Sequence, residues 1–209
     1  MSSAKATDAP GPPPLPPVDL AARPLPLHVC AAGTELFRVH RIARGSLFFS
    51  PPPGAPPAGR WDAPGGEFGV CYLGEESFAA FAETLLREPG ESVVESVELQ
   101  ARSMARFRVE RDLRLVALHG AGLARVGATA SVCTGPYAIT RAWSLSLHEH
   151  PERPDGIRYR ARHDDDGFAI ALFDRARDGV SEVETRGLLA PDGAGELAAW
   201  LDRYAIGLV

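Results

Sequence analysis

Hydrophobic residues recur along the chain in two spacings, which predict short strands and amphipathic helices in a mixed order. Strands are indicated by compact apolar runs at 36–39, 69–73, 107–109, 113–116, 157–162 and 168–173. Apolar residues at helical spacing predict helices over 75–87, 137–148 and 196–204. Alternation over 92–99 predicts one further strand. The mixture predicts a single compact α+β domain with a mostly antiparallel sheet.

Turn-forming residues separate these elements and set the expected ends of the domain. The acidic, glycine-ended linker at 163–167 predicts a hairpin between its two flanking strands. The proline-rich piece at 51–57 predicts a surface loop. Residues 1–26 are rich in proline, alanine and serine, so we expect a disordered segment or spacer, with a proline-recognition ligand as the alternative. The folded domain is then expected over 27–209.

Composition narrows the class of protein. The chain has 209 residues, of which 45% are hydrophobic and 23% charged, typical of a soluble protein with one sizeable core. A net charge of −5 without a block of like charge argues against direct nucleic-acid binding. The N-terminus lacks the pattern of a secretory signal, and no run approaches the ~20 apolar residues of a membrane span. We therefore expect a cytoplasmic protein with no membrane partner.

Common catalytic and metal-binding motifs are not found in the sequence. The cysteines Cys30, Cys71 and Cys133 are far apart, which argues against structural zinc and suits a reducing compartment. His163 precedes three aspartates, but consecutive aspartates in a turn point in different directions, so no metal site is predicted. Dinucleotide-fold, P-loop, serine-hydrolase and zincin motifs do not occur.

Four polar residues in this apolar setting are candidates for binding an anionic ligand. Arg38 and Arg60 lie beside apolar or glycine residues, and a guanidinium can donate two parallel hydrogen bonds to a phosphate. Tyr72 belongs to a predicted strand, and Glu83 lies off the apolar stripe of its predicted helix. Taken singly, each also fits a structural or solvated role, and these alternatives stay open.

Taken in chain order, short motifs across most of the domain resemble the RES domain, a family named for its arginine, glutamate and serine. The likeness runs from about 34 to 176. Each motif is weak alone, and the ordered series is what makes the resemblance specific. The series is Leu36-Phe37-Arg38-Val39, Gly59-Arg60-Trp61, Val70-Cys71-Tyr72-Leu73, Phe81-Ala82-Glu83, Asp112-Leu113, 135–143, and Asp155-Gly156-Ile157-Arg158-Tyr159 followed by 169–173.

The resemblance implies a compact α+β fold similar to the ADP-ribosyltransferase toxins. RES proteins are toxins of bacterial toxin–antitoxin pairs, usually neutralised by an Xre-like helix-turn-helix antitoxin. Activities known in the family are NAD+ degradation, including phosphorolysis of the nicotinamide–ribose bond, and ADP-ribosylation of a protein. The resemblance thus implies NAD+ as substrate, inorganic phosphate as co-substrate, an Xre-type partner, and neither a cofactor nor a metal.

Residue roles also follow from the resemblance. Glu83 would hold the ribose and, with Arg38, be catalytic, because a carboxylate stabilises the oxocarbenium-like sugar left when nicotinamide departs. Arg38 and Arg60 would bind phosphate groups, and Tyr72 would pack on the nicotinamide end. At the family's serine position stands Ala161, which lacks the hydroxyl. Losing one such hydrogen bond costs about 1–3 kcal/mol in the transition state.

Strand alternation bears on whether another residue replaces that hydroxyl. Arg158, Arg160 and Arg162 are expected on the sheet face opposite Tyr159 and Ala161. The leading hypothesis is an enzyme that cleaves NAD+ at the nicotinamide–ribose bond with phosphate as acceptor, acting as a toxin. The alternatives are a catalytically weak RES-like binding protein and an ADP-ribosyltransferase that modifies a protein.

Overall fold

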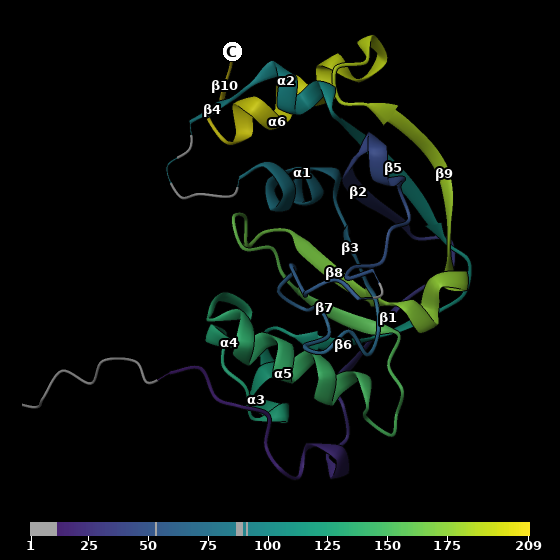
Figure 1. The fold of residues 1–209 in the computed structure, drawn as a ribbon, viewed down its shortest axis with the longest axis vertical. Helices are drawn as coiled ribbons and strands as arrows, with labels where there is room; N and C mark the ends of the chain where they lie inside the picture. The colour runs from purple at the N-terminus through teal and green to yellow at the C-terminus, as the bar shows by residue number, and fades with distance from the viewer. Residues whose placement is uncertain (1–11, 53, 87–89, 91) are drawn as a thin grey trace, which may run out of the picture.

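An eight-stranded curled sheet forms the centre of the computed structural model, which describes residues 12–52, 54–86, 90 and 92–209 (Figure 1). The strand order is β1-β6-β7-β8-β3-β2-β5-β9. Neighbouring strands are antiparallel except β6 and β7, which confirms the predicted mostly antiparallel sheet. The strands are β1 (Leu27–Cys30), β2 (Glu35–Arg41), β3 (Val70–Gly74), β5 (Arg102–Val109), β6 (Leu113–Leu118), β7 (Gly156–Arg160), β8 (Phe168–Phe173) and β9 (Val180–Gly187).

Helices gather in two groups on either side of the sheet (Figure 1). One group consists of α1 (Ser77–Leu85), α2 (Ser96–Gln100) and α6 (Ala194–Arg203). The other consists of α3 (Ala121–Val126), α4 (Ser131–Thr134) and α5 (Tyr137–His148). A small parallel pair, β4 (Val93–Val94) and β10 (Gly207–Leu208), lies beside the first group. Short 3-10 helices complete the fold at Leu20–Ala22, Ile42–Arg44, Asp174–Gly179 and Pro191–Gly193.

Three apolar clusters hold these layers together. The curled sheet encloses one cluster, in which Phe107 of β5 and Leu172 of β8 are fully buried. A second cluster packs α5 against the sheet through Trp143. The third packs α1 and α6 together through Phe81 and Trp200, whose rings lie 5.2 Å apart. Burying a large aromatic side chain contributes a few kcal/mol, so these clusters fix the sheet and both helical groups relative to one another.

Most elements predicted from periodicity are confirmed, but the strand predicted over 92–99 is wrong. Only Val93 and Val94 form a strand, and α2 begins at Ser96. Val93 is 48% exposed and Val97 60% exposed, whereas Leu99 is fully buried, so the alternating apolar residues do not share one buried face. The chain turns into α2 because Leu99, at the end of that helix, reaches the core.

The N-terminal segment is packed over part of the length for which disorder was expected. Residues 1–11 lie outside the described residues. For 12–26 the expectation is wrong: Leu20 and Leu25 are buried, and the Trp143 indole Nε1 donates to the Pro14 carbonyl at 2.7 Å. His150 also contacts the Leu20 carbonyl, at 3.2 Å. Prolines leave their carbonyls free to accept hydrogen bonds, so a proline-rich strap can dock onto α5 without strand pairing.

Candidate active site

The sheet opens between β2 and β3, and this opening positions the site. β2 pairs with β5 along its whole length, but it pairs with β3 only at Phe37 and Gly74. At Gly74 the following helix α1 packs closely, because an added Cβ would lie 2.8 Å from the backbone nitrogen of Ala80. Beyond this single pair the two strands diverge, so side chains of β2, β3 and α1 face a common space.

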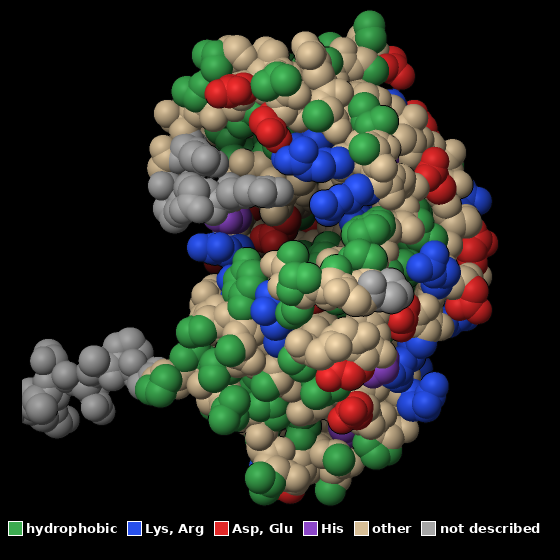
Figure 2. Space-filling view, in the orientation of Figure 1, with side chains coloured by type: hydrophobic (Ala, Val, Ile, Leu, Met, Phe, Trp, Pro, Cys, Tyr) green, Lys and Arg blue, Asp and Glu red, His purple; other side chains and the backbone are tan. Residues whose placement is uncertain are grey.

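A cavity of about 740 Å³ occupies this opening, within the roughly 300–1,000 Å³ of small-molecule sites. Figure 2 shows the hollow across the middle of the molecule, with basic side chains at its rim and an acidic side chain in its depth. Four of the five predicted site residues line it, namely Arg38, Arg60, Tyr72 and Glu83. The lining also includes Arg41, Arg44, Tyr137, Tyr159, Arg162 and His163.

Glu83 projects into the cavity from α1. The apolar stripe of this helix buries Phe81 and Leu85, which turns Glu83 away from the core and toward the opening. Its Oε1 accepts a hydrogen bond from the backbone N–H of Arg162. Burial raises the pKa of Glu83, while that N–H and the charges of Arg60 and Arg162 work in the opposite direction. A half-buried carboxylate among cations is suited to stabilising a developing positive charge.

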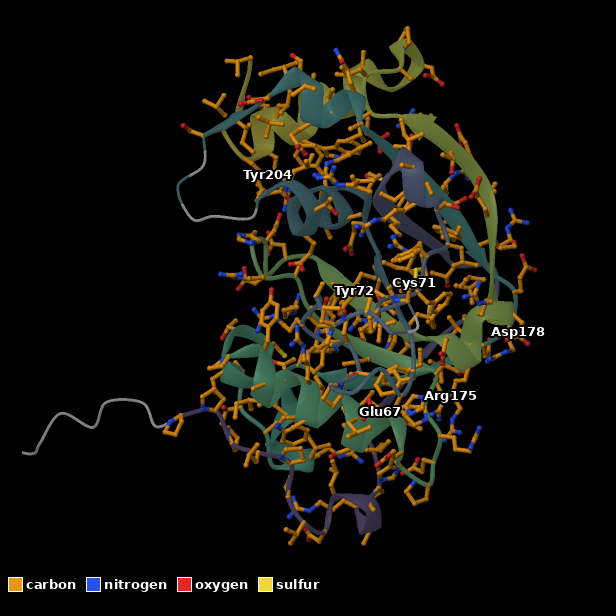
Figure 3. All side chains as sticks on the ribbon, viewed as in Figure 1. Glu67, Cys71, Tyr72, Arg175, Asp178 and Tyr204 are labelled. Carbon is orange, nitrogen blue, oxygen red and sulfur yellow. The ribbon has the colours of Figure 1, made fainter. Side chains whose placement is uncertain are left out.

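Tyr72 is fixed by a buried carboxylate on the 58–62 loop. Its hydroxyl donates to Oδ1 of Asp62 at 2.8 Å and accepts from the Trp61 N–H at 2.8 Å. Burial raises the pKa of Tyr72 well above its ordinary value, so the ring stays neutral. Figure 3 shows Tyr72 near the centre of the molecule, between the two helical groups. Its ring is therefore a fixed, uncharged wall of the cavity.

Asp62 also organises the loop that carries Arg60. Its Oδ2 accepts hydrogen bonds from the N–H groups of Ala58 at 2.9 Å and Gly59 at 2.7 Å, and from the Ser50 hydroxyl at 3.0 Å. A Cβ at Gly59 would lie 2.3 Å from the Tyr72 hydroxyl, so only glycine fits there. The Gly59-Arg60-Trp61 motif thus has a structural cause: the loop closes over Tyr72 and directs Arg60 into the cavity.

Arg60 is held by the start of α5. Its guanidinium donates to the Gly135 carbonyl at 2.6 Å and lies over the Tyr137 ring, 4.6 Å from the centroid. Arg141 lies over the same ring at 5.2 Å and donates to the carbonyls of Gly59 and Pro57. Cation–π contacts of this kind orient a guanidinium without neutralising it. Arg60 therefore keeps its charge available to a ligand.

Arg38 is oriented by neutral acceptors alone. Its guanidinium donates to the Phe48 carbonyl at 2.8 Å and to the Cys71 sulfur at 2.7 Å. Burial raises the pKa of the Cys71 thiol, so the sulfur accepts this bond as a neutral thiol. Arg38 thus resembles Arg60 in being positioned by hydrogen bonds that leave its positive charge uncompensated.

The electrostatic character of the cavity is strongly positive. Of the residues that the structure describes, five arginines line it, at positions 38, 41, 44, 60 and 162, against the one carboxylate of Glu83. Among the described residues, none of these five arginines forms an ion pair, whereas eight other arginines of the chain do. Guanidinium groups that line a concave site without acidic partners attract multiply charged anions.

Comparisons with known proteins agree with this geometry. The family model described as the RES domain matches residues 35–194, which is most of the chain. The chain belongs to the RES domain family. The matched range extends beyond the motifs recognised at 34–176 and takes in all of β9.

Two individual proteins are similar to this chain. The probable toxin y4kH of Sinorhizobium fredii (strain NBRC 101917 / NGR234) is 32% identical over 113 residues, which are 54% of this chain and 87% of that protein. A chain of the crystal structure of the M. tuberculosis MbcT–MbcA toxin–antitoxin complex superposes with a TM-score of 0.63 and 20% identity. The superposition covers 82% of this chain and 92% of that chain. At this identity the structural likeness shows a shared fold.

Ala161, which the resemblance places at the family's serine position, is not among the residues that line the cavity. Ala161, predicted to be substrate-binding, is 2% exposed, and its N–H donates to the Gly167 carbonyl at 3.1 Å. Arg162, in contrast, was expected on the opposite face and lines the cavity. The alternation fails here because β7 ends at Arg160 and the next residues turn into the hairpin loop. Arg162 thereby supplies donors next to the position of the absent hydroxyl.

Several site residues of this RES domain were missed from sequence. Asp62 gave no signal, because its carboxylate acts on backbone groups that meet only after folding. Arg41 and Arg44 follow the Arg38 motif at intervals of three, and this clustering was a usable signal. Tyr137 was interpreted only as part of a helix. Its contact with Arg60 joins residues far apart in sequence.

Metal binding and membrane insertion receive no support from the described part of the RES-family chain. Among the described residues, no three His, Cys, Asp or Glu side chains gather into a group that could hold a metal ion. None of the helices formed by those residues is long and apolar enough to cross a membrane. Two of the aspartates that follow His163, Asp164 and Asp166, instead form ion pairs with Arg203.

Proposed function

We propose that this protein is a toxin of a toxin–antitoxin pair that degrades NAD+ by cleaving the nicotinamide–ribose bond, with inorganic phosphate as the acceptor. One observation carries the proposal: a single half-buried carboxylate, Glu83, shares a cavity with five arginines that have no acidic partner among the described residues. Family membership and the name of the probable toxin from S. fredii support the toxin role.

The reaction needs charge stabilisation more than proton transfer. When the bond between the ribose carbon and the nicotinamide nitrogen breaks, its electron pair leaves with neutral nicotinamide. The sugar becomes oxocarbenium-like, and a carboxylate at the ribose stabilises that charge where it develops. A phosphate oxygen then forms the new bond to the same carbon, which gives ADP-ribose 1-phosphate. Among the described residues, Glu83 is the acidic side chain that lines the cavity, which supports this role for it.

The arginines suit both anionic reactants. NAD+ carries a pyrophosphate, and the acceptor carries further negative charge, so a cavity lined by several arginines suits both reactants. Arg38 and Arg60 approach from different elements, β2 and the 58–62 loop, and each is oriented by neutral acceptors. A guanidinium held in this way matches phosphate oxygens in a bidentate geometry. The uncharged ring of Tyr72 supplies a wall for the nicotinamide end.

An antitoxin partner belongs to the same proposal. The structurally similar MbcT–MbcA assembly is described as a toxin–antitoxin complex. A toxin that consumes NAD+ harms the cell that makes it, so it needs a partner that inhibits it. We infer an Xre-type helix-turn-helix antitoxin for this chain, encoded beside it, whose co-expression restores growth to cells that make the toxin.

Nicotinamide release tests the enzymatic proposal directly. Purified protein is incubated with NAD+, with and without inorganic phosphate, and nicotinamide and the sugar product are quantified. Release that depends on phosphate and yields ADP-ribose 1-phosphate is the expected result. Release of free ADP-ribose without phosphate would identify water as the acceptor, and label transferred to protein would identify an ADP-ribosyltransferase. No release under any condition would leave a binding protein.

A further inference from the structure

The loop between β7 and β8, residues 161–167, contributes directly to the cavity and is called the hairpin loop below. Arg162 and His163 line the cavity, and the Arg162 N–H donates to Glu83. One short segment therefore supplies both a guanidinium for the ligand and the backbone donor that orients the carboxylate. Its position decides the geometry of the site.

The hairpin loop has some internal structure of its own. The Gly167 N–H donates to the Asp164 carbonyl at 3.1 Å, and the Ala161 N–H donates to the Gly167 carbonyl at 3.1 Å. Arg160 closes the base by donating to the Asp165 carbonyl at 2.8 Å. These bonds shape the turn but do not tie it to the rest of the molecule. Just after the loop, the Phe168 N–H donates to Glu76 at 3.1 Å, and a further contact lies closer to Arg162 in the sequence.

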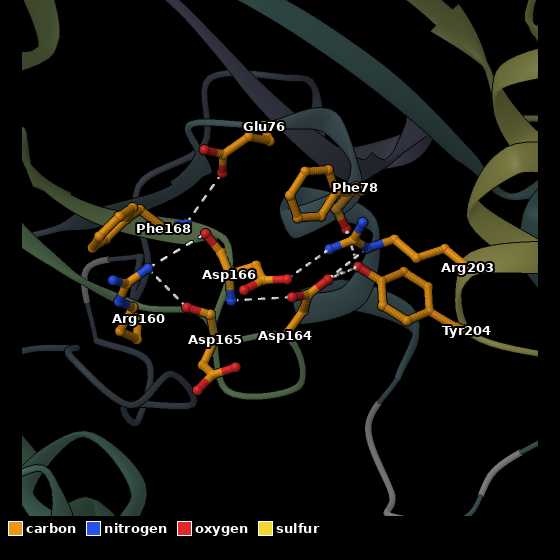
Figure 4. A network of polar contacts seen from close by, with 9 residues as sticks. All are labelled: Glu76, Phe78, Arg160, Asp164, Asp165, Asp166, Phe168, Arg203 and Tyr204. Carbon is orange, nitrogen blue, oxygen red and sulfur yellow. Dashed lines mark hydrogen bonds and ion pairs between the residues drawn. The ribbon is translucent and has the colours of Figure 1, made fainter.

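That contact comes from the end of α6. Figure 4 shows the Asp164 carboxylate turned toward Arg203 and Tyr204. Its Oδ2 lies 2.7 Å from the Arg203 Nε and 2.9 Å from the Tyr204 hydroxyl. The Asp164 side chain is only 9% exposed. Although burial works against ionisation, the bonds from Arg203 and Tyr204 hold the pKa of Asp164 below its ordinary value.

The same pair of residues is anchored on α1, the helix that carries Glu83. The Arg203 guanidinium lies over the Phe78 ring, 4.1 Å from its centroid. The Tyr204 hydroxyl lies 3.2 Å from the Phe78 carbonyl, and its ring is stacked parallel to Phe81 at 6.3 Å. The end of α6 therefore contacts both the hairpin loop and α1. It thereby fixes the position of Arg162, on the loop, relative to Glu83, on α1.

We propose that Asp164 and Arg203 are positioning residues of the active site, which hold the hairpin loop so that Arg162 meets both Glu83 and the anionic ligand. The role as stated rests on the proposed function, although the Glu83–Arg162 contact does not. Neither residue lines the cavity, so both act through Arg162. Asp164 occurs in the acidic linker at 163–167, for which the sequence alone predicted only a hairpin turn.

The physical consequence is a change in how Glu83 titrates. The Arg162 N–H and the Arg162 charge both favour the ionised form of Glu83. When the loop moves away from Glu83, both are withdrawn and only the charge of Arg60 is left to oppose the effect of burial, so the pKa of Glu83 rises. The carboxylate is the active form, so the acid limb of the pH profile of kcat/KM moves to higher pH. A merely structural role for Asp164 would not move it.

The decisive experiment titrates Glu83 in the full-length protein by NMR of carboxyl-labelled glutamate, with the resonance assigned through Glu83→Gln. The variants are Asp164→Asn and Arg203→Ala, and the matched control is Asp166→Asn. Asp166 faces the same Arg203 at 3.6 Å but is 86% exposed. We expect the Glu83 midpoint to move to higher pH in the first two variants and to stay unchanged in Asp166→Asn.

Activity provides the second measurement. Nicotinamide release by Asp164→Asn should show a kcat/KM about tenfold below wild type, with its acid limb moved to higher pH. An unmoved Glu83 midpoint in both folded variants overturns the inference. If wild type itself releases no nicotinamide, the proposed function fails, and the titration still decides the positioning role. Should Asp164→Asn not fold, Tyr204→Phe removes only the hydroxyl and is titrated in its place.

Discussion

Arg158 of β7 and the arginines that line the cavity have different partners. On the face opposite Tyr159, Arg158 forms a bidentate ion pair with Glu75 at 2.6 and 2.7 Å. It also contacts the His119 ring nitrogen at 2.7 Å and lies over the Phe168 ring, 3.3 Å from its centroid. On the Tyr159 side, the arginines that line the cavity have no acidic partner among the described residues.

The difference shows how one residue type serves stability in one place and binding in another. Arg158 is 11% exposed in its side chain and its charge is matched by Glu75, so the pair closes a nearly buried site. The cavity arginines repel one another and contribute no comparable pairing to the fold. Such an arrangement lowers stability and is kept where a ligand supplies the missing negative charge. Whether an arginine has an acidic partner, rather than how deeply it is buried, distinguishes a stabilising arginine from a ligand-binding one.

The largest expected effect comes from removing the carboxylate of Glu83, the acidic side chain among the described residues of the cavity lining. Glu83→Gln should lower kcat for nicotinamide release by about 10²-fold or more, because it removes the charge that stabilises the transition state. The raised pKa of Glu83 means that ionisation opposes folding at neutral pH. The variant should therefore unfold at a higher temperature than wild type, with the gain shrinking as pH falls through that pKa.

Glu75→Gln is the matched control for this prediction, because it changes the same group on the opposite face. It should lower the unfolding temperature and leave turnover by the folded protein unchanged. Near-wild-type kcat in Glu83→Gln would show that the catalytic carboxylate is misplaced.

For the Arg158–Glu75 ion pair we expect the reverse: its loss should lower stability and leave turnover unchanged. Arg158→Ala leaves Glu75 without its bidentate partner in a mostly buried site, and such losses cost about 3 kcal/mol of unfolding free energy. Urea denaturation measures this loss, and nicotinamide release by the remaining folded protein should match wild type. Arg158→Met combined with Glu75→Leu should regain part of the stability. A kcat reduced tenfold in folded Arg158→Ala would mean that the two faces are coupled.

A smaller effect is expected at Arg60, where the guanidinium is needed for its shape as well as its charge. Lysine cannot lie flat over Tyr137 while it donates to the Gly135 carbonyl, so Arg60→Lys keeps the charge and loses the orientation. We expect KM for NAD+ to rise about tenfold, with the unfolding temperature unchanged. Arg125→Lys on the exposed surface of α3 is the control. Unchanged KM in Arg60→Lys would show that charge alone suffices.

The sequence predicted elements well where periodicity and burial agree, as for the helix at Tyr137–His148, which the structure reproduces. It failed at 92–99, because apolar Val93 and Val97 are exposed. Within the site, the ordered motifs located Arg38, Arg60, Tyr72 and Glu83 in one cavity. The role of Asp62 could not be predicted, because it depends on how the 58–62 loop closes. Arg162 was predicted on the wrong face of the sheet, because β7 ends before it and the turn determines which way its side chain points.

The smallest effect is expected at Ala161, which the resemblance to the RES family places at that family's serine position. Ala161 is buried beside the cavity and does not line it, while Arg162 next to it does. A hydroxyl added there must find a partner within the turn and adds no donor to the cavity. Ala161→Ser should therefore change kcat/KM by less than about threefold, which corresponds to well under 1 kcal/mol. Ala169→Ser, on the cavity lining, is the comparison variant. A tenfold rise in Ala161→Ser would show that the hydroxyl reaches the substrate, and that Arg162 does not replace it.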